Sequence, residues 1–94
     1  MDIKQTEADG NGQFYIEENG KVLAEMVYSR RGTGHIIIEH THVDEALKGK
    51  GAGKQLLTKT VEWARKENIK VKPLCTFAHA MFQKVKEFQD VLDR

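Results

Sequence analysis

Hydrophobic residues alternate with polar ones in the first half of this sequence and recur at helical spacing in the second half. This change of period limits what the chain can fold into. Residues 13–29, QFYIEENGKVLAEMVYS, alternate between apolar and polar side chains on both sides of Asn19-Gly20. An Asn-Gly pair between alternating runs favours a β-hairpin, because a type I′ turn needs two positive φ angles. The sequence therefore predicts paired strands near residues 13–18 and 21–29, after a polar lead-in over residues 1–12.

A third strand is predicted near residues 35–43, HIIIEHTHV, because RRGTG before it indicates a turn. The three strands should form an antiparallel meander. Strict alternation divides the side chains of the third strand between two faces. One face is expected to carry Ile36, Ile38, His40 and His42, and the other Ile37, Glu39, Thr41 and Val43.

The apolar period becomes helical after Gly53. Apolar residues at helical spacing predict an amphipathic helix over residues 52–67, with Asn68 as its stop and Trp63 as a packing residue. IKVKPLC then indicates a short strand near 69–74, and Pro73 suits an edge strand because proline cannot donate to a ladder. Thr76 is expected to cap a final helix with an inward face of Met81, Phe82, Val85, Phe88 and Leu92.

The order β-β-β-α-β-α predicts an α/β (α+β) fold over a single domain, residues 1–94. The sheet should be largely antiparallel, with one parallel strand pair made by a right-handed β-α-β crossover and two helices flanking it. A chain of this length buries only a thin core.

The charge balance and the single cysteine exclude several classes of protein. Fifteen basic and 14 acidic residues leave a net charge of +1, so no basic field for nucleic acid is expected. No apolar run approaches the ~20 residues that cross a bilayer, and the N-terminus lacks the apolar core of a signal peptide. Cys75 has no partner for an internal disulfide. We therefore expect a cytoplasmic protein with no nucleic-acid or membrane partner, and leave its oligomeric state open.

A glycine-rich loop lies between the third strand and the first helix, in HVDEALKGKGAGKQLL, residues 42–57. Glycines at 49, 51 and 53 alternate with Lys50 and Ala52, and such a loop before a helix favours binding of phosphate oxygens by backbone N–H groups. A Walker A loop is excluded, because Lys48 stands where it needs glycine and Gln55 where it needs Ser or Thr. A dinucleotide fingerprint is also excluded, because the glycines are spaced G-x-G-x-G.

The segment KGKGAG resembles the Q/R-x-x-G-x-G/A motif of the GNAT-type N-acetyltransferases, with Lys48 in the first basic position. Together with HTHV and KVKPLC, it makes the chain similar, from about Phe14 to Leu92, to a family of very short GNAT-like acetyltransferases of unassigned substrate. This resemblance implies that loop amides bind the pyrophosphate of acetyl-CoA and that the strand before the loop splays from the next one to hold the pantetheine arm. The implied acetyl-CoA-binding residues are His42, Val43, Lys48, Gly49, Lys50, Gly51, Ala52, Gly53 and Lys54.

The resemblance also implies the reaction, which is transfer of an acetyl group from acetyl-CoA to an amine on a small molecule or protein. The alternative is a non-catalytic acyl-CoA-binding or interaction module, because the strands that follow the last helix in the family are missing from this sequence.

Catalysis needs a group that handles the proton of the attacking amine. Cys75 could accept the acetyl group, act as an acid or line the thioester pocket, and thiols near helix starts are generally more reactive. His40 could act as the base, or could be a histidine beside the core. His40, His42, Cys75 and His79 could also form a zinc set, but no C-x-x-C or H-E-x-x-H motif is present, so no metal is expected.

Overall fold

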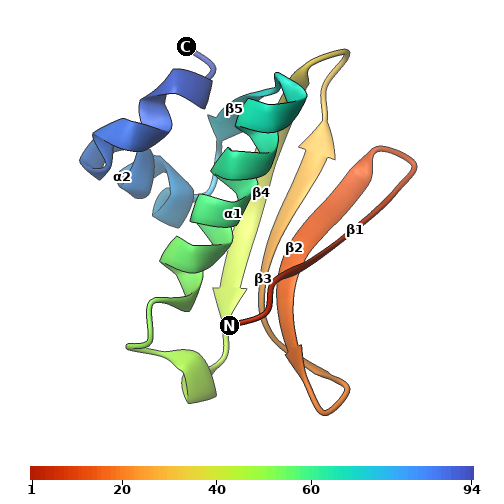
Figure 1. Cartoon of the computed structure of the whole chain (residues 1–94), viewed down its shortest axis with the longest axis vertical. Coiled ribbons are helices and arrows are strands. Elements are labelled where there is room, and N and C mark those ends of the chain that lie inside the picture. Colours follow the sequence, from red (N-terminus) through yellow and green to blue (C-terminus); the bar gives the residue numbers. More distant parts are fainter.

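The computed structural model describes all residues, 1–94, as a five-stranded sheet with helices on one face (Figure 1). The strands are β1 (Lys4–Ala8), β2 (Asn11–Glu18), β3 (Lys21–Arg30), β4 (His35–Val43) and β5 (Lys70–Pro73). The helices are α1 (Ala52–Glu67) and α2 (Thr76–Lys84), and the short 3₁₀ helices are η1 (Glu45–Leu47) and η2 (Lys86–Val91). The strand order is β1-β2-β3-β4-β5, and only β4 and β5 are parallel. This confirms the predicted fold class and the edge position of Pro73.

The expected polar lead-in is wrong, because Lys4–Ala8 form β1 and pair antiparallel with β2. Asp9 and Gly10 make the turn, with φ angles of 54° and 80°. An Asp-Gly pair is itself a hairpin motif. Alternation of apolar and polar residues does not reveal β1, because every side chain of this strand is exposed and none forms an apolar stripe.

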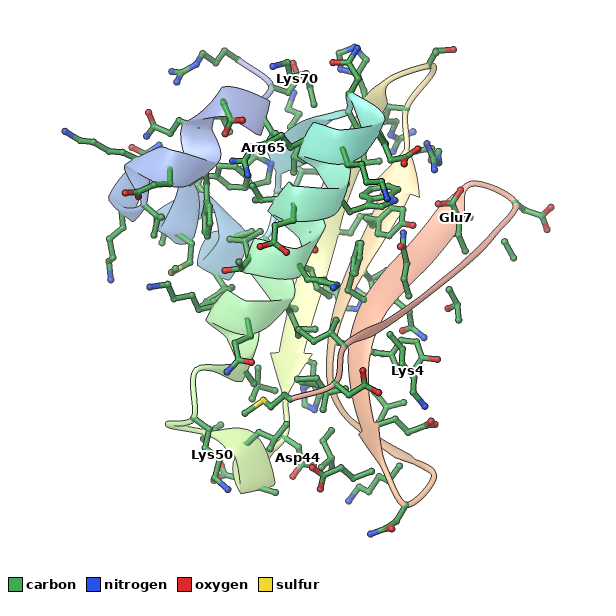
Figure 2. The ribbon with its side chains drawn as sticks, in the orientation of Figure 1. Lys4, Glu7, Asp44, Lys50, Arg65 and Lys70 are labelled. Atoms are coloured by element: carbon green, nitrogen blue, oxygen red, sulfur yellow. The ribbon has the colours of Figure 1, made fainter.

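Side-chain hydrogen bonds hold β1 to the sheet at Glu7, which Figure 2 labels. The Tyr28 hydroxyl donates to Glu7 at 2.6 Å, and Arg30 donates to the same carboxylate at 2.8 and 3.1 Å. These bonds, that of Arg30 first, lower the pKa of Glu7 below its usual value. Burial, followed by the bond to Glu7, raises the pKa of Tyr28 to about 12. A polar cluster thus replaces the apolar contacts that β1 lacks.

The predicted turn at Asn19-Gly20 and the predicted helix end at Asn68 are both confirmed, and both use residues with positive φ angles. Asn19 and Gly20 have φ angles of 53° and 78°, as a type I′ turn requires. Helix α1 covers Ala52–Glu67, and Asn68 ends it with φ 59° while its N–H bonds the carbonyls of Ala64 and Arg65.

The predicted final helix is wrong at both ends. Cys75, not Thr76, is the N-cap of α2, and the helix stops at Lys84. Gln89 donates to the carbonyl of Phe82 at 2.9 Å, and Arg65 on α1 binds Asp90 through two bonds of 2.7 Å. These contacts draw residues 86–91 into η2 along α1, which outweighs the continuous helical pattern.

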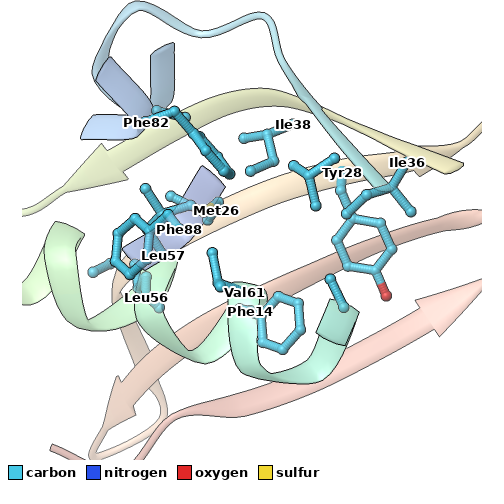
Figure 3. Packing of buried hydrophobic residues seen from close by; sticks show 14 of the residues in the cluster. Phe14, Met26, Tyr28, Ile36, Ile38, Leu56, Leu57, Val61, Phe82 and Phe88 are labelled. Atoms are coloured by element: carbon cyan, nitrogen blue, oxygen red, sulfur yellow. The ribbon is translucent and has the colours of Figure 1, made fainter. Parts of the chain in front are cut away.

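One hydrophobic core lies between the sheet and the helices (Figure 3). Trp63 on α1 packs edge-on against Phe14 at 5.6 Å between ring centroids and lies 5.4 Å from the ring of Tyr28. Phe82 and Phe88 form a second aromatic pair at 6.0 Å. The predicted packing roles of these rings are confirmed, while Met81, Val85 and Leu92 are only partly buried against the core.

A β-bulge in β4 reverses the faces that alternation predicts. Val27 pairs with His40 but the next residue, Tyr28, pairs with Ile38, so Glu39 is an extra residue in β4. His40 and His42 are therefore exposed on the open face of the sheet, opposite to Ile36 and Ile38. The predicted shared face is wrong beyond Ile38.

A substitution at Gly12 tests how closely the backbone of β2 packs against the Tyr28 ring. An ideal Cβ at Gly12 would lie 2.4 Å from Cζ of Tyr28, so Gly12→Ala should lower the free energy of unfolding by about 1–3 kcal/mol, measured by urea denaturation. A Tyr28→Leu background removes the ring contacts and leaves only the contact with the Thr6 carbonyl oxygen, 2.8 Å from that Cβ, so the same change should cost less there. Equal costs in both backgrounds would contradict this steric account.

Candidate functional site

A gap opens in the sheet where β4 and β5 diverge. Their parallel register ends at Ile38 and Pro73, so Glu39–Val43 of β4 have no partner in β5. The carbonyl of Ile38 accepts from the N–H groups of both Leu74 and Cys75, at 3.0 and 3.3 Å, and these bonds turn the chain out of β5. The gap therefore runs from Cys75 at its closed end toward the glycine loop that follows β4.

The glycine loop places free backbone donors at the open end of this gap. Gly49 and Gly51 have φ angles of 79° and 73°, a region that favours glycine. Gly51 is the N-cap of α1 and provides no side-chain cap, and the first helical bond runs from Gln55 N–H to the Gly51 carbonyl. The N–H groups of residues 52–54 therefore have no partner in the helix and can donate to an anion.

The third loop glycine has a packing role. A Cβ at Gly53 would lie 2.8 Å from Cζ of Phe77 at the start of α2. Glycine at this position lets the first turns of α1 and α2 approach each other closely. The start of the loop helix and the helix that begins after Cys75 are thus in direct contact.

The three loop lysines differ in their surroundings. Lys48 binds Glu45 at 2.9 Å, so its charge is partly neutralised. Lys50, labelled in Figure 2, and Lys54 are exposed and form no ion pair. The N-terminus of α1 carries no acidic residue in its first turn. The loop end of the gap is therefore positive, as an anion-binding site requires.

Cys75 lies at the closed end of the gap and is half-buried. Its sulfur accepts from the Ala78 N–H at 3.3 Å, and the hydroxyl of Thr41 lies 3.3 Å from it. Strict alternation predicted Thr41 on the face opposite Ile36 and Ile38, and only the bulge at Glu39 brings it to the thiol. Leu74 and Phe77, exposed by 59% and 37%, flank Cys75 and were not predicted as site residues.

The other predicted residues are distributed around the gap. Val43 packs partly against the core. His42 is exposed and lies opposite Glu25 of β3 in the strand register. His40 lies on the open face, so the structure does not bring it onto the face that holds Thr41 and Cys75. No three His, Cys, Asp or Glu side chains converge as a metal site would require. Neither helix is both long and apolar enough to cross a membrane.

Comparisons with known proteins agree with this geometry. The family model of the GCN5-related N-acetyl-transferases matches residues 13–91. An NMR structure of a GCN5-like protein from Staphylococcus aureus, assigned as a candidate N-acetyltransferase, is 38% identical, with a TM-score of 0.76 over 98% of this chain and 87% of that one. A search of functionally curated proteins finds no match.

Two more distant structures share the fold. The aminoglycoside N-acetyltransferase AAC(6')-Iy, solved with CoA, is 15% identical, with a TM-score of 0.64 over 88% of each chain. The ribosomal-protein-S18-alanine N-acetyltransferase from Escherichia coli is 17% identical, with a TM-score of 0.67 over 83% of this chain and 53% of that enzyme.

The splayed parallel pair, the glycine loop and these matches define an acetyltransferase fold. The chain belongs to the GCN5-related N-acetyltransferases, enzymes that move an acetyl group from acetyl-CoA to an amine.

Gly51 gives a direct test of the loop. Gly51→Glu adds a negative charge where we expect phosphate, so its affinity for acetyl-CoA should fall at least tenfold, or about 1.4 kcal/mol, by calorimetry. Gly51→Ala is the matched control, because it has the same positive φ without the charge and should lose clearly less. Wild-type affinity in a folded Gly51→Glu variant would place the pyrophosphate elsewhere.

Proposed function

We propose that acetyl-CoA lies in the gap between β4 and β5, with its pyrophosphate on the loop Lys48–Lys54 and its thioester near Cys75. The observation that carries this proposal is the position of the gap, which joins the free N–H groups at the start of α1 to the thiol. The part of β4 that has no partner in β5, Glu39–Val43, spans about 17 Å at about 3.3 Å per residue. An extended pantetheine arm would follow this edge, where His42 and Val43 end the strand, and Leu74 and Phe77 would cover its apolar parts.

The acceptor amine would approach from the open face of the sheet. On the helix side, the gap is closed by Thr41, Cys75 and the core beneath them. On the open side, Glu39 and His40 are exposed at the bulge and form no ion pair. A carboxylate there would attract a protonated amine, and His40 or a bound water would take the proton that the amine must lose. The acceptor is an amine on a small molecule or a protein segment that reaches this face.

Cys75 is the residue that we place at the reacting carbonyl. In the covalent route its thiol loses a proton and the sulfur attacks the thioester carbon. The bond to the CoA sulfur breaks, and CoA leaves as a thiol after taking up a proton. The amine then attacks the acetyl-cysteine, forms the amide, releases a proton and restores the thiol. The N–H of Ala78 and the hydroxyl of Thr41, each 3.3 Å from Sγ, would stabilise negative charge on the sulfur.

In the direct route the amine attacks acetyl-CoA itself. Cys75 then only shapes the pocket or gives a proton to the leaving CoA sulfur. Its position beside Thr41 serves either role equally well.

Cys75→Ala separates the two routes. If the thiol carries the acetyl group, the wild type incubated with acetyl-CoA should gain one acetyl group in intact-mass measurements. The variant should gain none and lose nearly all turnover, since Cys75 is the only thiol in the chain.

If the amine attacks directly, Cys75→Ala should bind acetyl-CoA and keep much of its activity. His40→Gln should then lower kcat with little change in acetyl-CoA affinity, and His79→Gln, on α2, is its control. A fully active Cys75→Ala variant rules out covalent catalysis.

A further inference from the structure

A cavity of about 300 Å³ lies between α1 and β1, and none of its lining residues belongs to the glycine loop or the β4–β5 gap. Its lining residues are Gln5, Phe14, Lys59, Glu62, Trp63 and Lys66. A second cavity of about 280 Å³ continues along the helix toward Ile3, shares Lys59 and Glu62 with the first, and is also lined by Lys54 of the glycine loop. The first cavity alone is the one argued below, and we call it the α1–β1 groove. Figure 1 shows the N-terminus beside α1, where β1 begins.

The groove has a fixed aromatic wall. The Trp63 indole is held by the rings of Phe14 and Tyr28 and by the guanidinium of Arg30, which lies 5.4 Å from the indole centroid. Phe14 is almost fully buried, whereas Trp63 remains partly exposed. A rigid, partly exposed indole at a cavity offers a flat apolar surface to a ligand.

The charges around the groove favour an anion. Lys59 and Lys66 are exposed on the same side of α1, with Glu62 between them, and none of the three forms an ion pair. The nearest acidic residue on β1, Glu7, is already neutralised by Arg30 at 2.8 Å. The charged side chains that line the first cavity therefore sum to one positive charge, and both ammonium groups are available to a ligand.

We propose that the α1–β1 groove binds a small amphiphilic anion, with a flat apolar body and one carboxylate or phosphate group. The body lies against the exposed part of Trp63, and the anionic group reaches Lys59 and Lys66. A cavity near 300 Å³ is at the small end of ligand pockets, so the occupant is a small molecule and not a folded partner. This site is separate from acetyl transfer.

Trp63 is the only tryptophan in the chain, so its indole N–H gives a single NMR resonance that reports on the groove. We would titrate the full chain with 2-naphthoate and with 2-naphthamide, its uncharged analogue. The indole resonance should shift saturably with naphthoate, which should bind at least about threefold more tightly than the amide, since exposed ion pairs contribute modestly. Saturating CoA should leave both affinities unchanged.

Charge reversal provides the second arm. Lys59→Glu and Lys66→Glu should each weaken naphthoate binding about fivefold while leaving naphthamide binding unchanged. Lys86→Glu, an exposed lysine in η2, is the matched control and should have no effect. The proposal is overturned by an indole resonance that does not move, by equal affinity for the two probes, or by displacement of naphthoate by CoA.

Discussion

The Ile38 carbonyl accepts hydrogen bonds from two consecutive N–H groups, those of Leu74 and Cys75, and this shared acceptor separates β5 from β4. Pro73 is the last β5 residue in register with β4, and beyond it both N–H groups go to this one acceptor and not to successive carbonyls of β4. The same turn places Cys75 at the N-cap of α2, with its sulfur toward β4. The end of a strand, the opening of the cleft and the position of the thiol thus have one local cause.

The two ends of the cleft are also coupled through the helices. Gly53 at the start of α1 faces the ring of Phe77 at the start of α2, with no room for a side chain between them. Loop amides at one end and the thiol at the other therefore belong to helices whose first turns are in contact. A change in the loop that shifts α1 would also shift α2, so packing sets the distance between the loop amides and the Cys75 thiol.

The parts of the fold that sequence predicts are those that local chemistry decides. Asn19-Gly20, the apolar period of residues 52–67 and Asn68 each specify one conformation without help from distant residues, and all three appear as expected. Strand β1 was missed because it is held by the Tyr28, Arg30 and Glu7 cluster, whose members are distant in sequence. The break after Lys84 was missed for the same reason, since Arg65 and Asp90 cause it.

The bulge at Glu39 has the largest effect on the site, and nothing in HIIIEHTHV predicts it. One extra residue exchanges the faces of all later side chains in β4, so Thr41 meets the thiol while His40 and His42 face solvent. The cleft therefore has a half-buried side with sulfur and hydroxyl and an exposed side with imidazoles and carboxylate. An acyl group benefits from exclusion of water, whereas an amine must arrive from water and lose a proton. A regular strand would have put both sets of groups on the opposite sides, so in the proposed arrangement the bulge places the thiol with the acyl group and the imidazoles with the incoming amine.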